Sequence, residues 1–224
     1  MKFVTIIPAR GGSKRFPGKN THSLNGIPLI CYSIEYSLNN PKVLGTYVTT
    51  DSDDIKNISR EAGAEIIDRP DILADDIATS ASVMKHAVEY LSAKGVEFDY
   101  VILLQATNPL RPKGLLNKAI DIIEKTGATS LFTVSHSEKK LGKIIDGKYV
   151  PWNYTFGMRS QDMEPLYYEN GLLYITSKEL LLQEIIEGKD AYPMVVEHPF
   201  GEVDIDTRED FEYAKFILSH YGQE

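Results

Sequence analysis

Short apolar runs alternate along this chain with longer segments in which apolar residues recur at helical spacing. A strand buried on both faces is a near-continuous apolar run, whereas a helix that covers a sheet carries one apolar stripe. The pattern predicts strands at 3–8, 46–50, 65–68, 99–105, 130–134 and 192–197. It predicts helices over 28–39, 52–64, 79–95, 112–125, 177–188 and 207–222.

The order of these elements indicates the fold class. Strands that alternate with helices of about ten to fifteen residues form βαβ units around a parallel sheet. We expect residues 1–224 to form a single α/β domain, with a Rossmann-like three-layer fold and a mainly parallel sheet. In such folds ligands bind outside the carboxyl ends of the strands, so the loops that follow strands are the candidate functional segments.

The pattern changes between about 143 and 176, where short extended pieces rich in aromatic residues replace the alternation. We interpret this segment as an inserted β arm that projects from the domain. Beyond it, Thr207 and Asp210 have the spacing of a capping box at the start of the last helix. Thr79 or Ser80 is expected to be the N-cap of an earlier helix, which ends at Gly95.

Composition narrows the class of protein. The formal net charge of -8 argues against general nucleic-acid binding, because affinity for a phosphate backbone needs a basic surface. The single cysteine, Cys31, has no partner for an internal disulfide, and no segment reaches the about 20 apolar residues of a transmembrane helix. We therefore expect a cytoplasmic protein without membrane or nucleic-acid partners. Its first acidic residue is Glu35, so the preceding segment is basic enough to bind one small anionic ligand.

The loop RGGSKRFPGKN, residues 10–20, is the strongest chemical signal and follows the first predicted strand. Its glycines allow a tight turn that brings backbone N–H groups to phosphate oxygens, and its four cations neutralise a triphosphate. A solvated basic loop would explain the charge but not the position of the glycines after a buried strand. A Walker loop is excluded because Gly12 and Gly18 enclose five residues and Asn20 follows Lys19. The dinucleotide pattern GxGxxG is also missing here, which leaves a nucleotide site of a third kind.

Two carboxylates, Asp204 and Asp206, alternate with Val203 and Ile205 before the last helix. In extended chain the two carboxylates share one face, which suits a hard cation. Mg²⁺ takes one or two carboxylates together with phosphate oxygens and water. The alternative interpretation is that Asp206 caps the helix. The run Asp71, Asp75 and Asp76 is interpreted as a solvated turn.

The loop at 10–20 after an apolar strand resembles the signature of the CMP-sugar synthetases, particularly the acylneuraminate cytidylyltransferases. The resemblance extends along nearly the whole chain. It includes RPDILADDIATS (69–80), LLQATNPLRP (103–112), NGLLYI (170–175) and DIDT (204–207), in the family's order and at similar spacings.

This resemblance implies roles for individual residues. The nucleotide would be bound by Arg10, Gly11, Gly12, Ser13, Lys14, Lys19 and Asn20 at the phosphates and by Arg69, Ala78 and Ser80 at the cytosine. The sugar would be bound by Gln105, Asn170 and Tyr174, and Arg159 would pair with its carboxylate. Asp204 and Asp206 would hold Mg²⁺ or Mn²⁺, and Arg10, Lys14, Lys19 and Asp206 would be catalytic. Without the resemblance, 69–80 would be a polar turn that caps a helix, and Gln105 would be the end of a strand.

The implied reaction couples CTP to the anomeric hydroxyl of a nine-carbon acidic sugar and releases pyrophosphate. The implied assembly is a homodimer in which the arms exchange contacts. Residues 159–171 depart from the more familiar family pattern, and Tyr168 stands where some members carry a basic residue. The acid is therefore left open among N-acetylneuraminate, its deaminated analogue, legionaminate and pseudaminate. A 3-deoxy-octulosonate cytidylyltransferase and a regulatory nucleotide-binding module without catalysis are the two alternatives.

Overall fold

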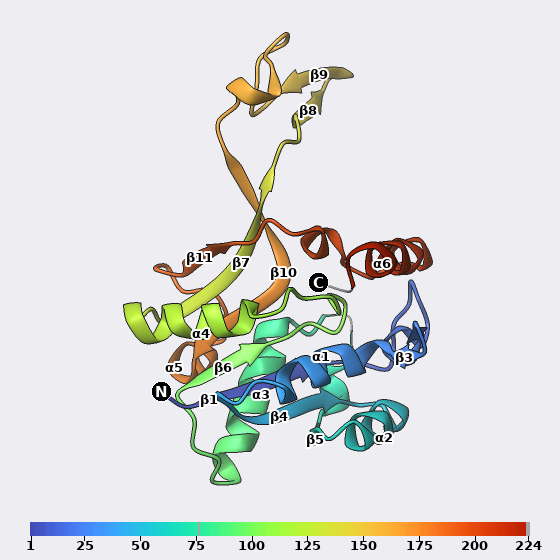
Figure 1. Cartoon of the computed structure of the whole chain (residues 1–224), viewed down its shortest axis with the longest axis vertical. Helices are drawn as coiled ribbons and strands as arrows, with labels where there is room; N and C mark the ends of the chain where they lie inside the picture. Colours follow the sequence, from blue (N-terminus) through green and yellow to red (C-terminus); the bar gives the residue numbers. More distant parts are fainter. Residues whose placement is uncertain (76, 223–224) are drawn as a thin grey trace.

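The core is a seven-stranded sheet with helices on both faces (Figure 1). The computed structural model describes residues 1–75 and 77–222 of the chain. The strand order is β11-β7-β10-β6-β1-β4-β5. The strands are β1 (Phe3–Pro8), β4 (Val43–Thr50), β5 (Glu65–Asp68), β6 (Tyr100–Leu103), β7 (Ser130–Ser137), β10 (Leu166–Ser177) and β11 (Tyr192–Val195).

Most neighbouring strands in this sheet are parallel. β1 is parallel to β4 and β6, β4 is parallel to β5, and β7 is parallel to β11. Among the described strands of this sheet, only β10 is antiparallel to its neighbours, β6 and β7. The predicted α/β class with a mainly parallel sheet is confirmed.

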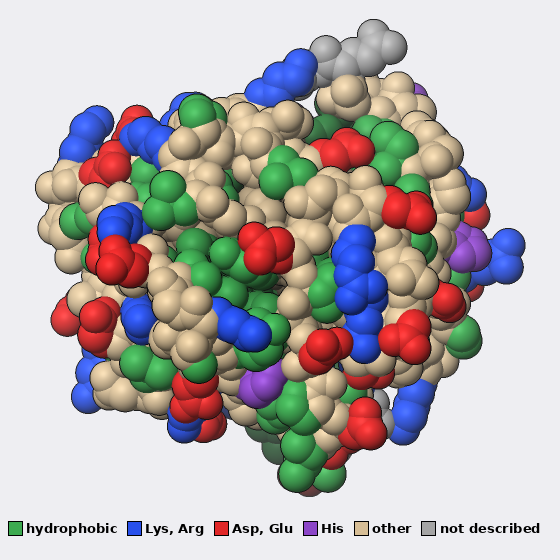
Figure 2. All heavy atoms as spheres, turned by 90° about the horizontal axis from the view of Figure 1, so that it is seen from below, with side chains coloured by type: hydrophobic (Ala, Val, Ile, Leu, Met, Phe, Trp, Pro, Cys, Tyr) green, Lys and Arg blue, Asp and Glu red, His purple; other side chains and the backbone are tan. Residues whose placement is uncertain are grey.

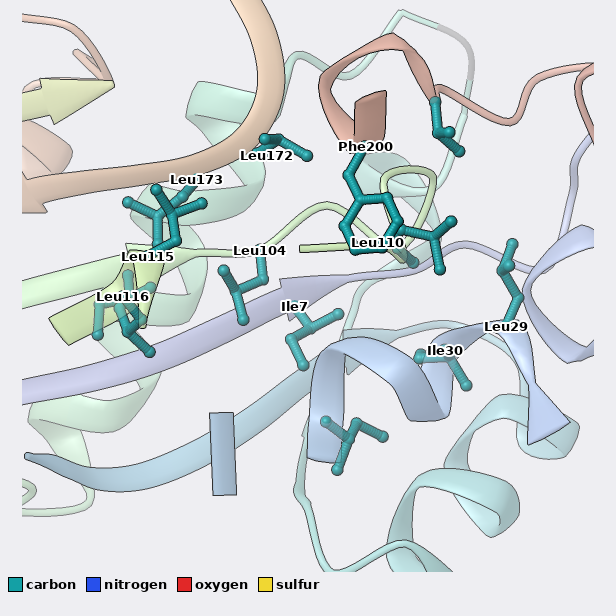
Figure 3. Close-up of a cluster of buried hydrophobic side chains, with 14 of the residues drawn as sticks. Ile7, Leu29, Ile30, Leu104, Leu110, Leu115, Leu116, Leu172, Leu173 and Phe200 are labelled. Carbon is teal, nitrogen blue, oxygen red and sulfur yellow. The ribbon is translucent and has the colours of Figure 1, made fainter. Parts of the chain in front are cut away.

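The helices divide between the two faces of the sheet. They are α1 (Leu29–Leu38), α2 (Asp53–Glu61), α3 (Ser80–Ala93), α4 (Leu115–Thr126), α5 (Lys178–Leu182) and α6 (Arg208–Tyr221). Side chains of β1 point alternately to the two faces of the sheet. Phe3 and Ile7 pack in the cluster with α1 and α4, whereas Val4 and Ile6 pack in the cluster with α3. Figure 3 shows the first of these clusters. All four of these β1 side chains are at most 1% exposed, so the strand is fully buried.

The projecting arm is shorter than the sequence indicates. Its hairpin consists of β8 (Gly142–Ile145) and β9 (Lys148–Pro151) and lies at the top of Figure 1. The predicted arm extends to 176, but β10 returns into the core sheet between β6 and β7. The expectation was wrong there because NGLLYI is a mostly buried segment that pairs within the sheet through a register shift between Glu169 and Tyr174, with Gly171 at a φ of +71°.

Several predicted elements end earlier than expected, among them a helix and a strand. The helix expected over 177–188 stops at Leu182, and Glu184 has a positive φ of 60°. This break lets the Ile186 carbonyl accept a hydrogen bond from Thr176 Oγ1 at 2.6 Å, while the Ile186 side chain packs against the cluster under α3. The strand expected over 99–105 ends at Leu103, so Gln105 lies in a loop.

The remaining elements are small. The β2 (Ser23–Leu24) and β3 (Ile27–Pro28) pair follows the basic loop. Four 3-10 turns complete the described elements: η1 (Lys19–Thr21), η2 (Asp71–Leu73), η3 (Ser160–Asp162) and η4 (Pro199–Glu202). On the face shown in Figure 2, acidic and basic side chains are interspersed with apolar ones.

Candidate active site

A cavity of about 470 Å³ lies at the carboxyl ends of β1 and β6, where the sequence places the candidate loops. We call it the nucleotide cavity. It is lined by Pro8, Ala9, Arg10, Ser13, Lys14, Arg15, Lys19, Asn20, Arg69, Ser80, Gln105, Ala106, Thr107 and Asp206. Nine of the predicted site residues are therefore brought together around one space, although they come from five separate segments.

Hydrogen bonds to its backbone hold the basic loop in place. Asn20 Nδ2 donates to the Arg10 carbonyl at 3.0 Å and ties the two ends of the loop together. The Gly11 N–H donates to Asp51 Oδ1 at 3.0 Å, and a Cβ at Gly11 would lie 2.9 Å from Ser52 Cβ. Gly11 is thus needed for the close approach of the loop to the end of β4, whereas Gly12 has open space around it. Both glycines shape the loop without lining the cavity.

An ion-pair network joins this loop to the other end of the chain. Lys19 Nζ donates to the Ile205 carbonyl at 2.7 Å and to Asp206 Oδ1 at 2.9 Å. Arg15 Nη2 donates to Asp206 Oδ2 at 2.5 Å. The Lys19 side chain is 8% exposed and that of Arg15 is 68% exposed, so the first pair is much better shielded from solvent than the second. Arg15 is one of the four cations of the loop, but its contact with Asp206 could not be predicted from the sequence.

The far end of the cavity is formed by Arg69 and the start of α3. Arg69 is buried, and its Nη2 donates to the Thr49 carbonyl at 2.6 Å. Burial lowers the pKa of Arg69 to about 10, with Asp51 opposing the shift, so the guanidinium keeps its charge at neutral pH. Thr79 caps α3 by accepting from the Ser82 N–H at 3.1 Å, and Ser80 lines the cavity.

The segment between Arg69 and α3 is a turn held by Asp75. Asp75 Oδ1 accepts from the Ile77 and Ala78 N–H groups at 2.9 and 2.8 Å, and the Asp75 carbonyl accepts from Arg10 Nη1 at 3.1 Å. The Ala78 N–H is therefore occupied within the turn, and Ala78 does not line the cavity. Asp76, which the sequence analysis included in the same turn, lies outside the described residues.

A second cavity of about 400 Å³ adjoins the first and shares Gln105 with it. We call it the sugar-side cavity. It is lined by Gln105, Asn108, Tyr168, Glu169, Asn170, Gly171, Tyr174, Gly201, Glu202 and Asp204. The three sequence-predicted residues Gln105, Asn170 and Tyr174 all face it. Asn170 is nevertheless engaged by the fold, because its Oδ1 accepts from Thr133 Oγ1 at 2.6 Å and its Nδ2 donates to Ser135 Oγ at 2.9 Å.

Two buried polar side chains, Arg111 and Asn108, fix the backbone segments around these cavities, and neither was singled out from the sequence. Arg111 Nη2 donates to the Gln105 carbonyl at 2.9 Å, while its Nε donates to the Leu172 carbonyl at 2.5 Å. Burial lowers the pKa of Arg111 to about 10. Asn108 Nδ2 donates to the carbonyls of Asn170 at 3.1 Å and Val203 at 2.9 Å. The motif at 103–112 contains both residues, but only the fold shows what they contact.

Arg159 lies outside both cavities. It precedes η3 on the arm, where Nε and Nη2 donate to the Asp162 carboxylate at 2.8 and 2.9 Å. Its side chain is 74% exposed. Within this chain Arg159 is thus carried away from Gln105, Asn170 and Tyr174.

The two candidate metal ligands face neighbouring cavities. Val203 and Ile205 are buried, while Asp204 lines the sugar-side cavity and Asp206 lines the nucleotide cavity. This is the predicted alternation, although the segment is irregular and not a strand. Burial and the charge of Asp206 both raise the pKa of Asp204, and a hydrogen bond from Thr107 opposes them.

The side chain of Asp206 is not the cap of α6. The capping box is formed by Thr207 and Asp210, and Asp210 Oδ2 accepts from the N–H groups of Asp206 and Thr207 at 2.9 and 2.8 Å. Hard carboxylate oxygens of this kind fit Mg²⁺ when phosphate and water complete its shell. The described residues contain no cluster of three or more His, Cys, Asp or Glu side chains that would form a complete metal site alone.

The sequence signature of the family described as Cytidylyltransferase matches residues 4–223. The chain belongs to this family. It is 33% identical over 223 residues to a pseudaminic acid cytidylyltransferase from Campylobacter jejuni, which covers 97% of this chain and 96% of that protein. It is 34% identical to a CMP-N,N'-diacetyllegionaminic acid synthase from Legionella pneumophila, covering 97% of both chains. It is also 34% identical to an N-acylneuraminate cytidylyltransferase from Streptococcus agalactiae, where the match spans 94% of this chain and 52% of that protein.

Solved structures support the fold of this cytidylyltransferase. A CMP:2-keto-3-deoxy-manno-octonic acid synthetase in complex with CTP matches 98% of the chain with a TM-score of 0.71 and 17% identity. A 4-diphosphocytidyl-2C-methyl-D-erythritol synthase matches 97% with a TM-score of 0.68 and 14% identity. At these identities the likeness concerns the fold alone. Among the described residues, every helix is too short or too polar to span a bilayer.

Proposed function

We propose that this cytidylyltransferase couples CTP to the anomeric hydroxyl of a nonulosonic acid and releases pyrophosphate. The observation that carries the proposal is the pair of adjoining cavities, because a nucleotide and a sugar bound there would meet at Gln105. The relatives at 33–34% identity are named for pseudaminic, legionaminic and acylneuraminic acids, which supports this class of acceptor. The anomeric oxygen would attack the α-phosphorus in line with the departing pyrophosphate.

The residues of the nucleotide cavity suit this reaction. Arg10, Lys14, Arg15 and Lys19 line it, and they would neutralise the triphosphate and stabilise the charge that develops on pyrophosphate. Asp204 and Asp206 would hold Mg²⁺, which supplies further charge neutralisation at the phosphates when bound. Gln105, whose backbone Arg111 fixes, would orient the acceptor.

The test is pyrophosphate release from CTP and Mg²⁺ with each of the four nonulosonic acids and with 3-deoxy-octulosonate. Release with at least one nonulosonic acid is expected. Release with the octulosonate alone would overturn the proposed acceptor. The proposal gives more weight to the named relatives, at 33–34% identity, than to the octulosonate synthetase structure, which is only 17% identical. A chain that binds CTP but releases no pyrophosphate with any acid would be a regulatory module.

With the best acid, CTP is expected to be preferred over UTP, ATP and GTP by at least about tenfold in kcat/KM. The Thr49 carbonyl holds Arg69 in position, and Thr79 rather than Ser80 caps α3. The polar groups of Arg69 and Ser80 can therefore contact the base of the nucleotide. A wrong base would leave these groups unpaired, and this is most costly at Arg69, which is buried. Nucleotides would be compared at equal Mg²⁺ and acid concentrations. Equal turnover with UTP would contradict the cytosine assignment.

A homodimer built through the arm is part of the proposal. The arm exposes large apolar side chains, and Ile144, Trp152 and Phe156 are 72%, 63% and 73% exposed. Burial of such a surface against a second copy is favourable, and it would carry Arg159 toward the partner. Sedimentation analysis is expected to give twice the chain mass. A monomer at the concentrations used for turnover would contradict this assembly.

A further inference from the structure

The nucleotide cavity and the sugar-side cavity form a row with a third cavity. The nucleotide cavity and the sugar-side cavity share Gln105. The sugar-side cavity shares Tyr168 and Glu202 with a third cavity of about 660 Å³. That third cavity is also lined by Ser135, His136, Ser137, Glu138, Lys139, Val196, Glu197, His198 and Pro199. No described residue lines both the first and the third, so the sugar-side cavity lies between them.

The boundary between the second and third cavities is a contact between two side chains. Tyr168 of β10 donates its phenol O–H to the Glu202 carboxylate of η4. Lys139 Nζ lies 6.0 Å from the centre of the Tyr168 ring on the side of the third cavity. Burial and Glu202 raise the pKa of Tyr168 to about 12, so the phenol keeps the proton that it donates throughout the neutral range.

The proposed reaction fixes the direction in which the acid lies. Its anomeric hydroxyl must reach the α-phosphorus, so the anomeric end lies at the Gln105 boundary. The exocyclic tail of a nonulosonic acid is at the other end of the carbon chain from the anomeric carbon, so an acid that extends through the sugar-side cavity has its tail toward Tyr168 and Glu202. Tyr168 is also a position at which the sequence departs from the family resemblance.

We propose that the hydrogen-bonded pair of Tyr168 and Glu202 is the end wall of the sugar site and determines which tails are accepted. This inference rests on the proposed function. With the wall closed, the sugar-side cavity takes an acid whose tail carries only small groups. With the wall removed, the second and third cavities become continuous, and a longer acyl group on the tail enters the space lined by His136, Lys139 and His198.

The experiment compares two forms of whichever acid reacts fastest, one with its ordinary tail and one with a butanoyl group added to the tail. In the unchanged chain, kcat/KM for the butanoyl form is expected to be at least about tenfold lower, a discrimination typical of a closed pocket. Tyr168→Ala and Glu202→Ala should each reduce that discrimination by roughly fivefold or more, because each opens the wall. Testing both variants keeps the result interpretable if one of them folds poorly.

Two matched variants separate the wall from other effects. Glu202→Gln keeps an oxygen that accepts the phenol O–H, so the discrimination should stay as it is. Tyr167→Ala removes the neighbouring aromatic residue, which contacts His136 and lies outside the three cavities, and should also change nothing.

The possible outcomes distinguish this inference from the proposed function. Turnover with an unchanged discrimination ratio in folded Tyr168→Ala and Glu202→Ala would overturn the end wall and leave the proposed function standing. An equal change in Tyr167→Ala would also overturn it, because the effect would then not depend on the boundary. Failure of the unchanged chain to use any nonulosonic acid would overturn both.

Discussion

Asp206→Asn is expected to lower kcat by roughly a hundredfold or more while the fold is retained. The Asp206 carboxylate meets Lys19 Nζ at 2.9 Å and Arg15 Nη2 at 2.5 Å at the edge of the nucleotide cavity. Asparagine has the same shape without the charge, so it holds both cations more weakly and is a poorer ligand for Mg²⁺. Helix α6 should remain intact, since Thr207 and Asp210 form its cap.

The measurement is pyrophosphate release across a Mg²⁺ titration, with circular dichroism as the check on folding. The variant should also need a higher Mg²⁺ concentration for half-maximal rate. Asp121→Asn is the matched control, because Asp121 pairs with Lys42 at 2.7 Å on the surface, away from both cavities. Its kcat should equal that of the unchanged chain. A near-normal kcat for Asp206→Asn at ordinary Mg²⁺ would reduce Asp206 to a structural link between the basic loop and the last helix.

The sequence predicted those parts of the fold that depend on local signals. The strand at 65–68 has the predicted bounds, and the capping box of Thr207 and Asp210 forms as its spacing indicates. Apolar periodicity and caps act within a few residues, so they can be read from the chain without knowledge of its neighbours. Of the residues around the nucleotide cavity, the local pattern pointed by itself only to the basic loop at 10–20 and to Asp206, whereas Arg69, Ser80 and Gln105 were identified through the family resemblance.

The errors concern contacts between distant segments. The segment 170–175 has a sequence that would suit a strand of the arm as well as a strand of the core. Only its pairing with β6 and β7 places it in the sheet. The early end of α5 depends on Ile186 reaching Thr176 and the second core cluster. Neither contact leaves a periodic signal in the local sequence.

The same reason explains what the site prediction missed. Arg111 binds the Leu172 carbonyl 61 residues away, and Arg15 binds Asp206 191 residues away. A basic residue in a loop has no property that reveals which distant acceptor it meets. A guanidinium suits a carboxylate partner, so the sequence indicated Arg159 as a ligand of the sugar. Only the path of the arm shows that its side chain lies away from the cavities of its own chain.

Lys19→Ala is expected to lower kcat/KM for CTP by at least about tenfold, because a charge-assisted contact contributes about 1.5–3 kcal/mol. Two of the three donors of the ammonium are used, one on the Ile205 carbonyl and one on Asp206. Lys19 also lines the nucleotide cavity, so the third donor remains for a phosphate oxygen. Its side chain is 8% exposed, and this low exposure strengthens each of these interactions relative to water.

A matched surface lysine distinguishes a phosphate contact from the general loss of an ion pair. Lys42 pairs with Asp121 at 2.7 Å and with Glu124 at 2.8 Å, and it lies outside the cavities. Lys42→Ala should therefore leave kcat/KM for CTP unchanged, whereas Lys19→Ala should lower it in a chain that circular dichroism shows to be folded. Unchanged kinetics in folded Lys19→Ala would remove the basic loop from the active site. In that case the contacts of Lys19 with Ile205 and Asp206 would serve only to join the two ends of the chain, and the variant should then lose thermal stability without losing turnover.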